Sequence, residues 1–123
     1  MNDFYDAIIK EEQCRKRSYI TLETYQQAIN ALASIALTET SGGRAAAQVL
    51  LSAWNGYSWQ LDITDLCYLD YELLEQALVV ISGRVILMTE PHEVINNGNV
   101  VMRNIAAQWD CLNVQRRGRN DDV

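Results

Sequence analysis

LLEQALVVISGRVILM, residues 73–88, is the stretch that decides the fold class of this 123-residue chain. Read as one helix, it is apolar nearly all round from Ala77, which is typical of a helix buried at the centre of a domain. Read as strands, residues 78–81 and 84–87 flank Ser82-Gly83 in the manner of a two-residue hairpin turn. The first interpretation gives an all-α domain, and the second introduces a sheet.

The residues at the start of this stretch favour the helix. Asp70 precedes Tyr71-Glu72-Leu73-Leu74 as an N-cap residue precedes a first helical turn, where its carboxylate accepts hydrogen bonds from unpaired N–H groups. Residues 72–78 are mostly strong helix formers. We therefore predict one buried central helix over residues 70–88. Within it, Gly83 costs about 1 kcal/mol relative to alanine and allows a neighbouring element to pack closely.

The chain before this helix also has helical periodicity. Residues 22–36 carry an apolar stripe at i, i+3, i+4 spacing, and Thr21 stands where the N-cap of that helix would be. A helix of small residues follows Ser41, which we predict as its cap. Asn55-Gly56 is expected to end that helix, with glycine in the left-handed conformation.

The chain after the central helix continues the same pattern. Pro91 closes the central helix, Asn96-Asn97-Gly98 forms a turn, and apolar residues from Val101 to Leu112 line a final helix. The sequence thus predicts an all-α fold, a single compact helical domain of five or six helices.

The chain divides into three segments by composition. Residues 1–17 form an N-terminal helix that is expected to dock by its first half, through Phe4 and Ile8, because its second half is charged. Residues 18–114 form an acidic helical body. Residues 115–123 have no apolar periodicity and are predicted to be a disordered tail. The three segments make one domain overall.

Charge is distributed unevenly along the chain. The net charge is −6, but the body alone carries ten acidic and three basic residues, a net charge of −7. An acidic body repels phosphate and favours a protein partner with a basic surface. Nucleic acid could be reached only through the basic residues near the two ends, which are Arg15, Lys16, Arg17, Arg116, Arg117 and Arg119.

LDITDLCYLD, residues 61–70, contains three aspartates among apolar residues. Asp62 and Asp70 have the positions of N-caps, and Asp65 follows Asp62 by three residues and supports that cap. The spacing lacks the glycine and the alternate ligand positions of a calcium loop. We interpret the aspartates as residues that start helices, and we predict no metal here.

The only histidine, His92, stands in Glu90-Pro91-His92-Glu93. A zinc site needs three or four converging ligands, so we predict a solvated turn at the end of a helix. A hydrolase built from Asp62, Asp65 and His92 is a third-ranked hypothesis. The sequence contains no nucleophile elbow, P-loop or dinucleotide-binding glycine motif. We therefore predict a protein that is not an enzyme, with no catalytic residues, cofactor or bound metal.

The three cysteines, Cys14, Cys67 and Cys111, are widely spaced and odd in number, which is typical of reduced thiols in a cytoplasmic protein. Cys67 and Cys111 lie among apolar residues and are expected to act as small core side chains. No apolar run reaches about 18 residues and the start of the chain does not resemble a signal peptide, so no membrane association is predicted.

Two groups of residues are candidates for partner binding. Tyr57 and Trp59, close to Trp54, are either core aromatics or an aromatic anchor at an interface, where tyrosine and tryptophan are over-represented. The second group consists of acids that flank the central helix and its exit turn, and several of them are expected on the surface. These acids are Glu72, Glu75, Glu90 and Glu93.

Residues 28–112 resemble a family of short uncharacterised bacterial proteins, a domain of unknown function met on plasmids, prophages and other mobile elements. The matching elements are Thr40-x-Gly42 with Ala47-x-x-Leu50-Leu51-x-x-Trp54-Asn55, and Leu61-Asp62-Ile63-Thr64-Asp65-Leu66 with Asp70. Weaker echoes are Glu90-Pro91-His92 and Trp109. The resemblance favours a helix over residues 73–88 and implies a mobile-DNA context, but no activity.

Two hypotheses of function lead. In the first, the protein is an accessory protein of a mobile element or phage that sequesters a basic host protein. By analogy with small acidic proteins of such elements, it would inhibit a CRISPR-type defence complex. In the second, it is a homodimeric regulatory protein whose Arg-rich ends touch nucleic acid.

Overall fold

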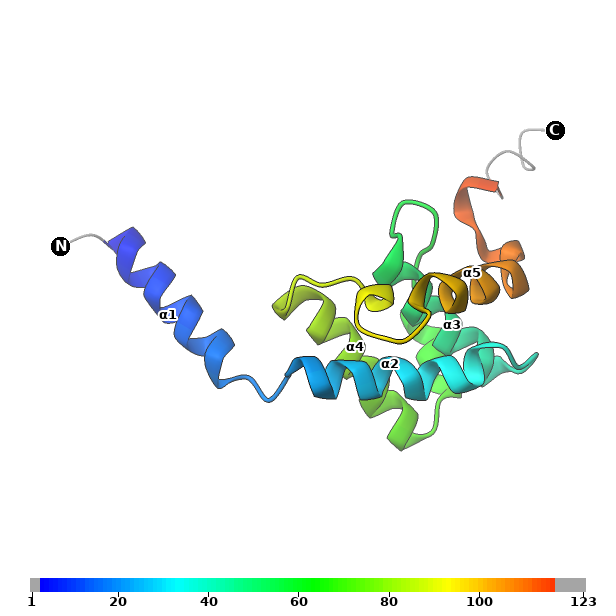
Figure 1. The fold of residues 1–123 in the computed structure, drawn as a ribbon, viewed down its shortest axis with the longest axis horizontal. Helices are drawn as coiled ribbons and strands as arrows, with labels where there is room; N and C mark the ends of the chain where they lie inside the picture. Colours follow the sequence, from blue (N-terminus) through cyan, green and yellow to red (C-terminus); the bar gives the residue numbers. More distant parts are fainter. Residues whose placement is uncertain (1–2, 117–123) are drawn as a thin grey trace.

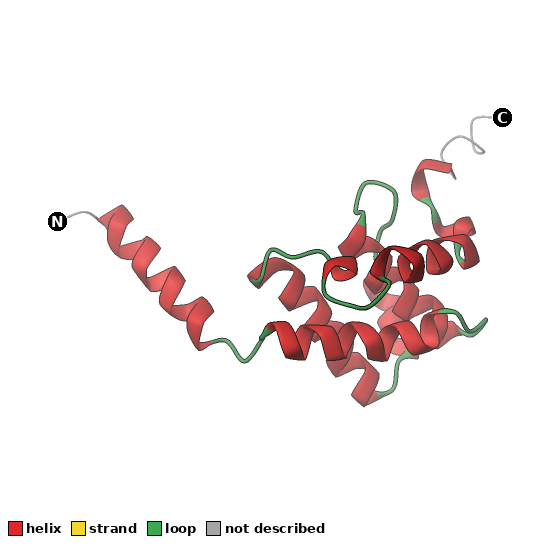
Figure 2. Ribbon diagram, in the orientation of Figure 1, coloured by secondary structure: helices red, strands yellow, loops and turns green. Residues whose placement is uncertain are grey.

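The structure, a computed structural model, describes residues 3–116, and within that range every regular element is a helix (Figure 2). The five α-helices are α1 (Asp3–Arg17), α2 (Leu22–Ala36), α3 (Ser41–Trp54), α4 (Tyr71–Ile86) and α5 (Gly98–Gln108). Three short 3-10 helices complete the fold, and these are η1 (Ile63–Tyr68), η2 (Pro91–Glu93) and η3 (Asp110–Leu112). The prediction of an all-α fold is confirmed.

The helix interpretation of residues 73–88 is correct, because α4 runs unbroken through Ser82-Gly83. Asp70 is its N-cap, and its carboxylate accepts a hydrogen bond from the N–H of Leu73 at 2.9 Å. The helix ends at Ile86, two residues before the predicted end. Met88 follows in a left-handed conformation that stops further helical bonding.

The central buried helix is α3 and not α4, so that part of the prediction is wrong. All seven residues from Ala45 to Leu51 are buried, because three alanines allow neighbours to approach α3 from all sides. In α4 only Ala77, Val80 and Gly83 are buried. Leu78, which was expected in the core, is 48% exposed.

The helices α2 to α5 pack into one body, and α1 extends away from it (Figure 1). Within the body, α2 lies against both α3 and α4, and α5 lies against α3 and η2. The apolar core therefore lies between α2, α3 and α4, with α5 closing one side. Its largest fully buried side chains include Tyr25, Ile29, Leu32, Leu50, Leu51, Met102 and Ile105.

The crossing of α2 and α4 depends on Gly83, as the sequence predicted. A β-carbon at this position would lie 2.5 Å from Cδ1 of Tyr25, which is closer than van der Waals contact allows. The ring of Tyr25 is fully buried against the backbone of α4. Its hydroxyl donates a hydrogen bond to the carbonyl oxygen of Thr89 at 2.7 Å and so holds the segment that leaves α4.

Burial also changes the acidity of this tyrosine. Removal from water raises the pKa of Tyr25 from 10.0 to about 12, because the phenolate form is disfavoured. The charge of Arg84 opposes this shift, whereas the charges of Glu93 and Glu90 reinforce it.

The helix N-termini are capped mainly as the sequence predicts, with one exception. The hydroxyl of Thr21 accepts a hydrogen bond from the N–H of Thr24, and the side chain of Thr24 accepts one from the N–H of Thr21. For α3 the cap is Thr40 and not Ser41, because the hydroxyl of Thr40 accepts the N–H of Gly43 at 2.9 Å.

The C-termini of α3 and α2 are closed by side chains that are distant in sequence. No described glycine has a positive φ, so the left-handed glycine expected at Gly56 is not present. Instead, Arg84 donates to the carbonyl oxygen of Ala53 at the end of α3, and the indole N–H of Trp109 donates to that of Ala36 at the end of α2. These donors satisfy carbonyl groups that a helix end leaves unpaired.

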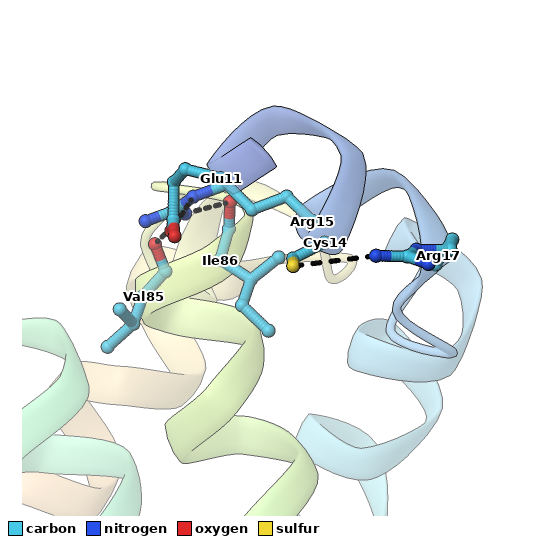
Figure 3. A network of polar contacts seen from close by, with 6 residues as sticks. All are labelled: Glu11, Cys14, Arg15, Arg17, Val85 and Ile86. Carbon is cyan, nitrogen blue, oxygen red and sulfur yellow. Dashed lines mark hydrogen bonds and ion pairs between the residues drawn. The ribbon is translucent and has the colours of Figure 1, made fainter. Parts of the chain in front are cut away.

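The same device attaches α1 to the body (Figure 3). The guanidinium of Arg15 donates to the carbonyl oxygens of Val85 and Ile86, at 3.4 and 3.2 Å, and also pairs with Glu11 at 3.1 Å. The expectation that α1 docks by its first half is wrong, because none of its residues is buried. The contact is instead made by the last turn, where a positive charge favours the negative end of the α4 dipole.

Two smaller expectations also require correction. Cys67 and Cys111 are exposed, as is Cys14, so neither acts as a core side chain. The predicted disordered tail begins too early, because residues 114–116 form a helical turn. The rest of that tail, residues 117–123, lies outside the described residues.

Among residues 3–116, every helix is too short or too polar to cross a membrane.

Replacing Gly83 with alanine tests the α2–α4 contact. Alanine normally stabilises the interior of a helix by about 1 kcal/mol relative to glycine. Here we expect Gly83→Ala to destabilise the protein by about 1–3 kcal/mol, because the new methyl group meets a ring that cannot move. Urea denaturation followed by circular dichroism measures the change. Gly56→Ala is the control, since its methyl group meets only ordinary contacts; a stabilised Gly83→Ala variant would contradict the packing.

The raised pKa of Tyr25 predicts alkaline sensitivity. The unfolded chain loses the phenol proton near pH 10, whereas the folded chain keeps it until about pH 12. The stability contributed by the neutral phenol is therefore complete below pH 10 and is lost as the pH rises towards 12. Denaturation curves between pH 8 and 11.5 should show this slope in the wild type and in Tyr57→Phe, and a smaller slope in Tyr25→Phe. Equal slopes would show that Tyr25 is not the group responsible.

Candidate functional site

The four acids proposed for partner binding do not form one surface. Glu72 and Glu75 are exposed on the first turns of α4, whereas Glu90 and Glu93 lie beyond its other end, around η2. A helix of 16 residues is about 24 Å long, so α4 separates the two pairs. The structure therefore provides two acidic sites where the sequence suggested one.

The two aromatic candidates also have different environments. Trp59 is only 5% exposed and belongs to the core, so it cannot be an anchor for a partner. Tyr57 is exposed in the loop after α3. Its carbonyl oxygen accepts a hydrogen bond from the side chain of Gln115, which places it next to the C-terminal segment.

One side of α4 points away from the core and is apolar along most of its length. Tyr71, Leu78 and Val85, spaced seven residues apart, are 74%, 48% and 60% exposed. A spacing of seven residues returns to the same side of a helix after two turns. Glu75 and Ser82 fall on the same side. We call these five residues the α4 outer face.

A hollow of about 450 Å³ adjoins the outer face at its N-terminal half. Tyr19, an exposed residue of the link between α1 and α2, lines the hollow together with Tyr71 and Leu78. Gln76, Val79 and the carboxylate-bearing Glu75 complete it. The hollow thus combines apolar walls with a single negative charge, which suits a partner side chain that has an apolar stem and a basic end.

The aspartates of residues 61–70 are used within the fold, as predicted. Asp62 caps η1, and its carboxylate accepts hydrogen bonds from the hydroxyl and the N–H of Thr64, at 2.7 and 3.0 Å. Both bonds lower the pKa of Asp62, and the bond from the hydroxyl has the larger effect. Asp65 does not join this cap. It accepts a hydrogen bond from Gln48 at 2.6 Å and pairs with Arg44 at 3.5 Å.

Gln48, like Arg44, connects α3 with η1. It is the buried polar residue of the described core, and both of its amide atoms are occupied. Its nitrogen donates to Asp65, and its oxygen accepts the N–H of Asp62 at 2.8 Å. A hollow of about 300 Å³ opens beside this group. Because its central polar atoms already bond one another, we interpret the group as structural.

The structure places the three residues of the hydrolase hypothesis in two separate groups. Asp62 and Asp65 are bonded to Thr64, Gln48 and Arg44, whereas His92 lies with Glu90 and Glu93. No hydrogen bond or ion pair found among residues 3–116 joins the two groups.

Around η2, three side chains with electron-pair donors converge. One ligand atom each from Glu90, His92 and Glu93 lies within 4.8 Å of the other two. The sequence placed Glu90, His92 and Glu93 close together along the chain but did not show their convergence in space. The 3-10 turn supplies it, because it turns the chain tightly enough to bring Glu93 back towards Glu90. The carboxylate of Glu93 accepts the N–H of Glu90 at 3.0 Å.

Several of the basic end residues proposed for nucleic acid have intramolecular acceptors. Arg15 binds α4, Arg17 donates to the carbonyl oxygen of Gln13, and Arg116 pairs with Asp110 at 2.8 Å. Arg117 and Arg119 lie outside the described residues.

Sequence reasoning missed the α4 outer face, since a segment that is apolar nearly all round indicates complete burial. The signal was present in the seven-residue spacing of Tyr71, Leu78 and Val85, with Glu75 and Ser82 on the same side of the helix. Two polar residues in line with these three apolar residues indicate that this side of α4 faces solvent, although the helix also carries Glu72, Gln76 and Arg84.

The family model described as "Family of unknown function (DUF7673)" matches residues 26–110. This match covers more than half of the chain, which therefore belongs to that family, and the predicted membership of an uncharacterised domain family is confirmed. The matched region runs from within α2 to η3 and excludes α1. No curated protein and no solved structure matches the chain.

Asp70 fixes the start of α4 and with it the position of Tyr71 and Glu72. We expect Asp70→Ala to reduce the free energy of unfolding by about 0.5–2 kcal/mol, because the first-turn N–H groups lose their acceptor. Asp70→Asn keeps that acceptor and should cost little. Chemical denaturation of the three proteins measures both changes. A loss in the asparagine variant equal to that in the alanine variant would show that capping is not what Asp70 contributes.

Proposed function

We propose that this member of a family of unknown function is a non-enzymatic protein-binding module, and that its partner docks on the α4 outer face. The observation that carries the proposal is the exposure of Tyr71, Leu78 and Val85 along a single line of one helix. The partner we infer is a protein whose contact surface is basic and also offers apolar contacts.

The apolar part supplies affinity. Large apolar side chains aligned on an exposed helix face are typical of a surface that a partner covers. Tyr71 stands at one end of this line, next to the hollow that Tyr19 helps to form. A tyrosine beside a pocket is the kind of residue that dominates binding energy at protein interfaces. Loss of Leu78 or Tyr71 should therefore mainly speed dissociation.

The charged part supplies selection and speed. Glu75 lies on the outer face and Glu72 beside it, and both side chains are exposed. The body that carries them has ten acidic and three basic residues. Such a field attracts a basic surface at long range and repels phosphate, so it raises the association rate more than it strengthens the final complex.

A sharper form of the proposal names the role. A protein with an acidic body that docks on a basic surface can occupy a site that would otherwise hold nucleic acid. The resemblance to proteins of plasmids and prophages supports a role in a mobile element or phage, as an inhibitor of a CRISPR-type host-defence complex. The negative body and the outer face support this role over an enzymatic one, since the polar group around Gln48 is internally bonded.

The alternative is a homodimeric regulator that touches nucleic acid through its Arg-rich ends. Its support is weaker, because Arg15 and Arg116 already bind groups within the chain, the carbonyl oxygen of Ile86 and the carboxylate of Asp110. Binding of duplex DNA or RNA that falls steeply with rising salt would favour this alternative and count against the protein-binding proposal.

Site-specific photo-crosslinking tests where the partner docks. A photoreactive amino acid placed at Leu78 should form a discrete adduct with one protein in host cells, because that side chain faces the partner. The same amino acid at Asn104, an exposed position on α5, is the control. Adducts at position 104 equal to those at position 78 would contradict docking on the outer face.

Once crosslinking has identified the partner, the kinetics of its binding to the free protein test the role of Glu72 and Glu75. We expect Glu72→Lys with Glu75→Lys to slow association by about tenfold at low salt and to have little effect at high salt. Glu23→Lys is the matched control, because Glu23 also lies in the first turn of a helix but on α2. An association rate that is unchanged across the salt series would overturn the proposed role of the acids.

A further inference from the structure

The turn at η2 brings three side chains of metal-ligating type together, independently of the docking face. We infer that Glu90, His92 and Glu93 bind one divalent transition-metal ion, with zinc as the ion that fits best. The sequence alone predicted no metal, because a zinc site needs three or four converging ligands and the sequence did not show that convergence. The inference rests on the convergence of the three ligands and on the buried nitrogen of His92 that has no hydrogen-bond partner.

Convergence of the ligands is the first observation. One donor atom from each of the three residues lies within 4.8 Å of the others. Ligands at 2.0–2.2 Å from a zinc ion lie roughly 3.3–3.5 Å from one another in a tetrahedral site. The three side chains therefore need to move by only about an ångström to enclose an ion, which rotations about their side-chain bonds provide.

The buried nitrogen of His92 is the second observation. Its Nδ1 is inaccessible to solvent and has no hydrogen-bond partner. The nearest carboxylate oxygen, Oε2 of Glu90, is 3.7 Å away, which is too far for a hydrogen bond. A buried polar atom without a partner is unfavourable, and a cation between Nδ1 and the two carboxylates would give this nitrogen a partner.

The turn is held in place by its surroundings, so the ligands are arranged before an ion binds. Pro91 is fully buried and fixes the start of the turn. A β-carbon at Gly98 would overlap the carbonyl group of His92, so α5 can begin directly against the turn only because position 98 is glycine. Gln26 of α2 donates to the carbonyl oxygen of Val94 at 2.7 Å and holds the turn from the other side.

The ligand set selects the type of metal. One imidazole nitrogen with two carboxylates suits zinc, cobalt or nickel, whereas calcium prefers oxygen ligands alone and a higher coordination number. Three protein ligands leave a fourth position for water or for a group from a partner. Catalytic zinc sites share this open position, but the site proposed here is a binding site and no reaction is assigned to it.

A protonated His92 paired with Glu90 is the competing explanation of the same cluster. It predicts a histidine whose proton, and not a metal, occupies the space between the ligands. Because the chain contains a single histidine, every imidazole signal of the untagged protein reports on this one site.

The test is a titration of the untagged protein with zinc chloride at pH 7.5, followed by calorimetry and by nitrogen NMR of the imidazole. We expect one ion per chain and a shift of the Nδ1 resonance, with Nε2 changing less. His92→Asn and Glu93→Gln should each weaken zinc binding by at least about tenfold. Glu39→Gln, an exposed acid elsewhere, should leave it unchanged.

The three exposed cysteines are a competing source of zinc ligands, so the titration is repeated on the variant with Cys14, Cys67 and Cys111 replaced by serine. Binding that survives these replacements and is lost with His92→Asn supports the site. The inference is overturned if the wild type binds no zinc below 1 mM, if the serine variant alone abolishes binding, or if the ion shifts Nε2 and leaves Nδ1 unchanged. The NMR result on the wild type decides the question even if a variant fails to fold.

Discussion

The contact between the ring of Tyr25 and the backbone at Gly83 is the constraint on which the remainder of this fold depends. It sets how closely α2 and α4 approach, and only a residue without a side chain allows it. The hydroxyl of the same tyrosine binds the carbonyl oxygen of Thr89, immediately before Glu90. One side chain therefore fixes both the depth at which α4 packs and the starting point of the turn that carries His92. Because this position is buried, the pKa of the Tyr25 phenol is raised.

Beside the apolar core, side chains distant in sequence close the C-terminal ends of three helices. Arg84 closes α3, Trp109 closes α2 and Arg15 closes α4, in each case by donating to carbonyl oxygens that the helix itself leaves unpaired. This arrangement links the end of each helix to a residue distant in sequence, so secondary structure and tertiary packing stabilise each other. Arg15 links α1 to the body, and the body itself coincides closely with the region of the family match.

The two proposals use different parts of the same helix and its exit. The side of α4 that packs into the core carries Ala77, Val80 and Gly83. Tyr71, Leu78 and Val85 lie on another side of the helix and are therefore exposed in the isolated chain. The turn at η2 is compact because Pro91 is buried and Gly98 lies against it. The proposed metal ligands lie beyond the C-terminal end of α4, whereas the hollow of the docking face adjoins the N-terminal half of that helix.

The sequence by itself determined what depends on neighbouring residues. The helical periodicity, the caps at Thr21, Asp62 and Asp70, the close approach at Gly83 and the acidic body could all be read from local patterns, because capping and helical spacing act over a few residues. The sequence could not decide which apolar side of α4 faces solvent, that α3 and not α4 is central, that Trp59 is buried, or that Cys67 and Cys111 are exposed. Nor could it decide that Glu93 joins Glu90 and His92 around an unpartnered nitrogen. These features depend on which faces of distant helices meet, and only the tertiary structure establishes those contacts.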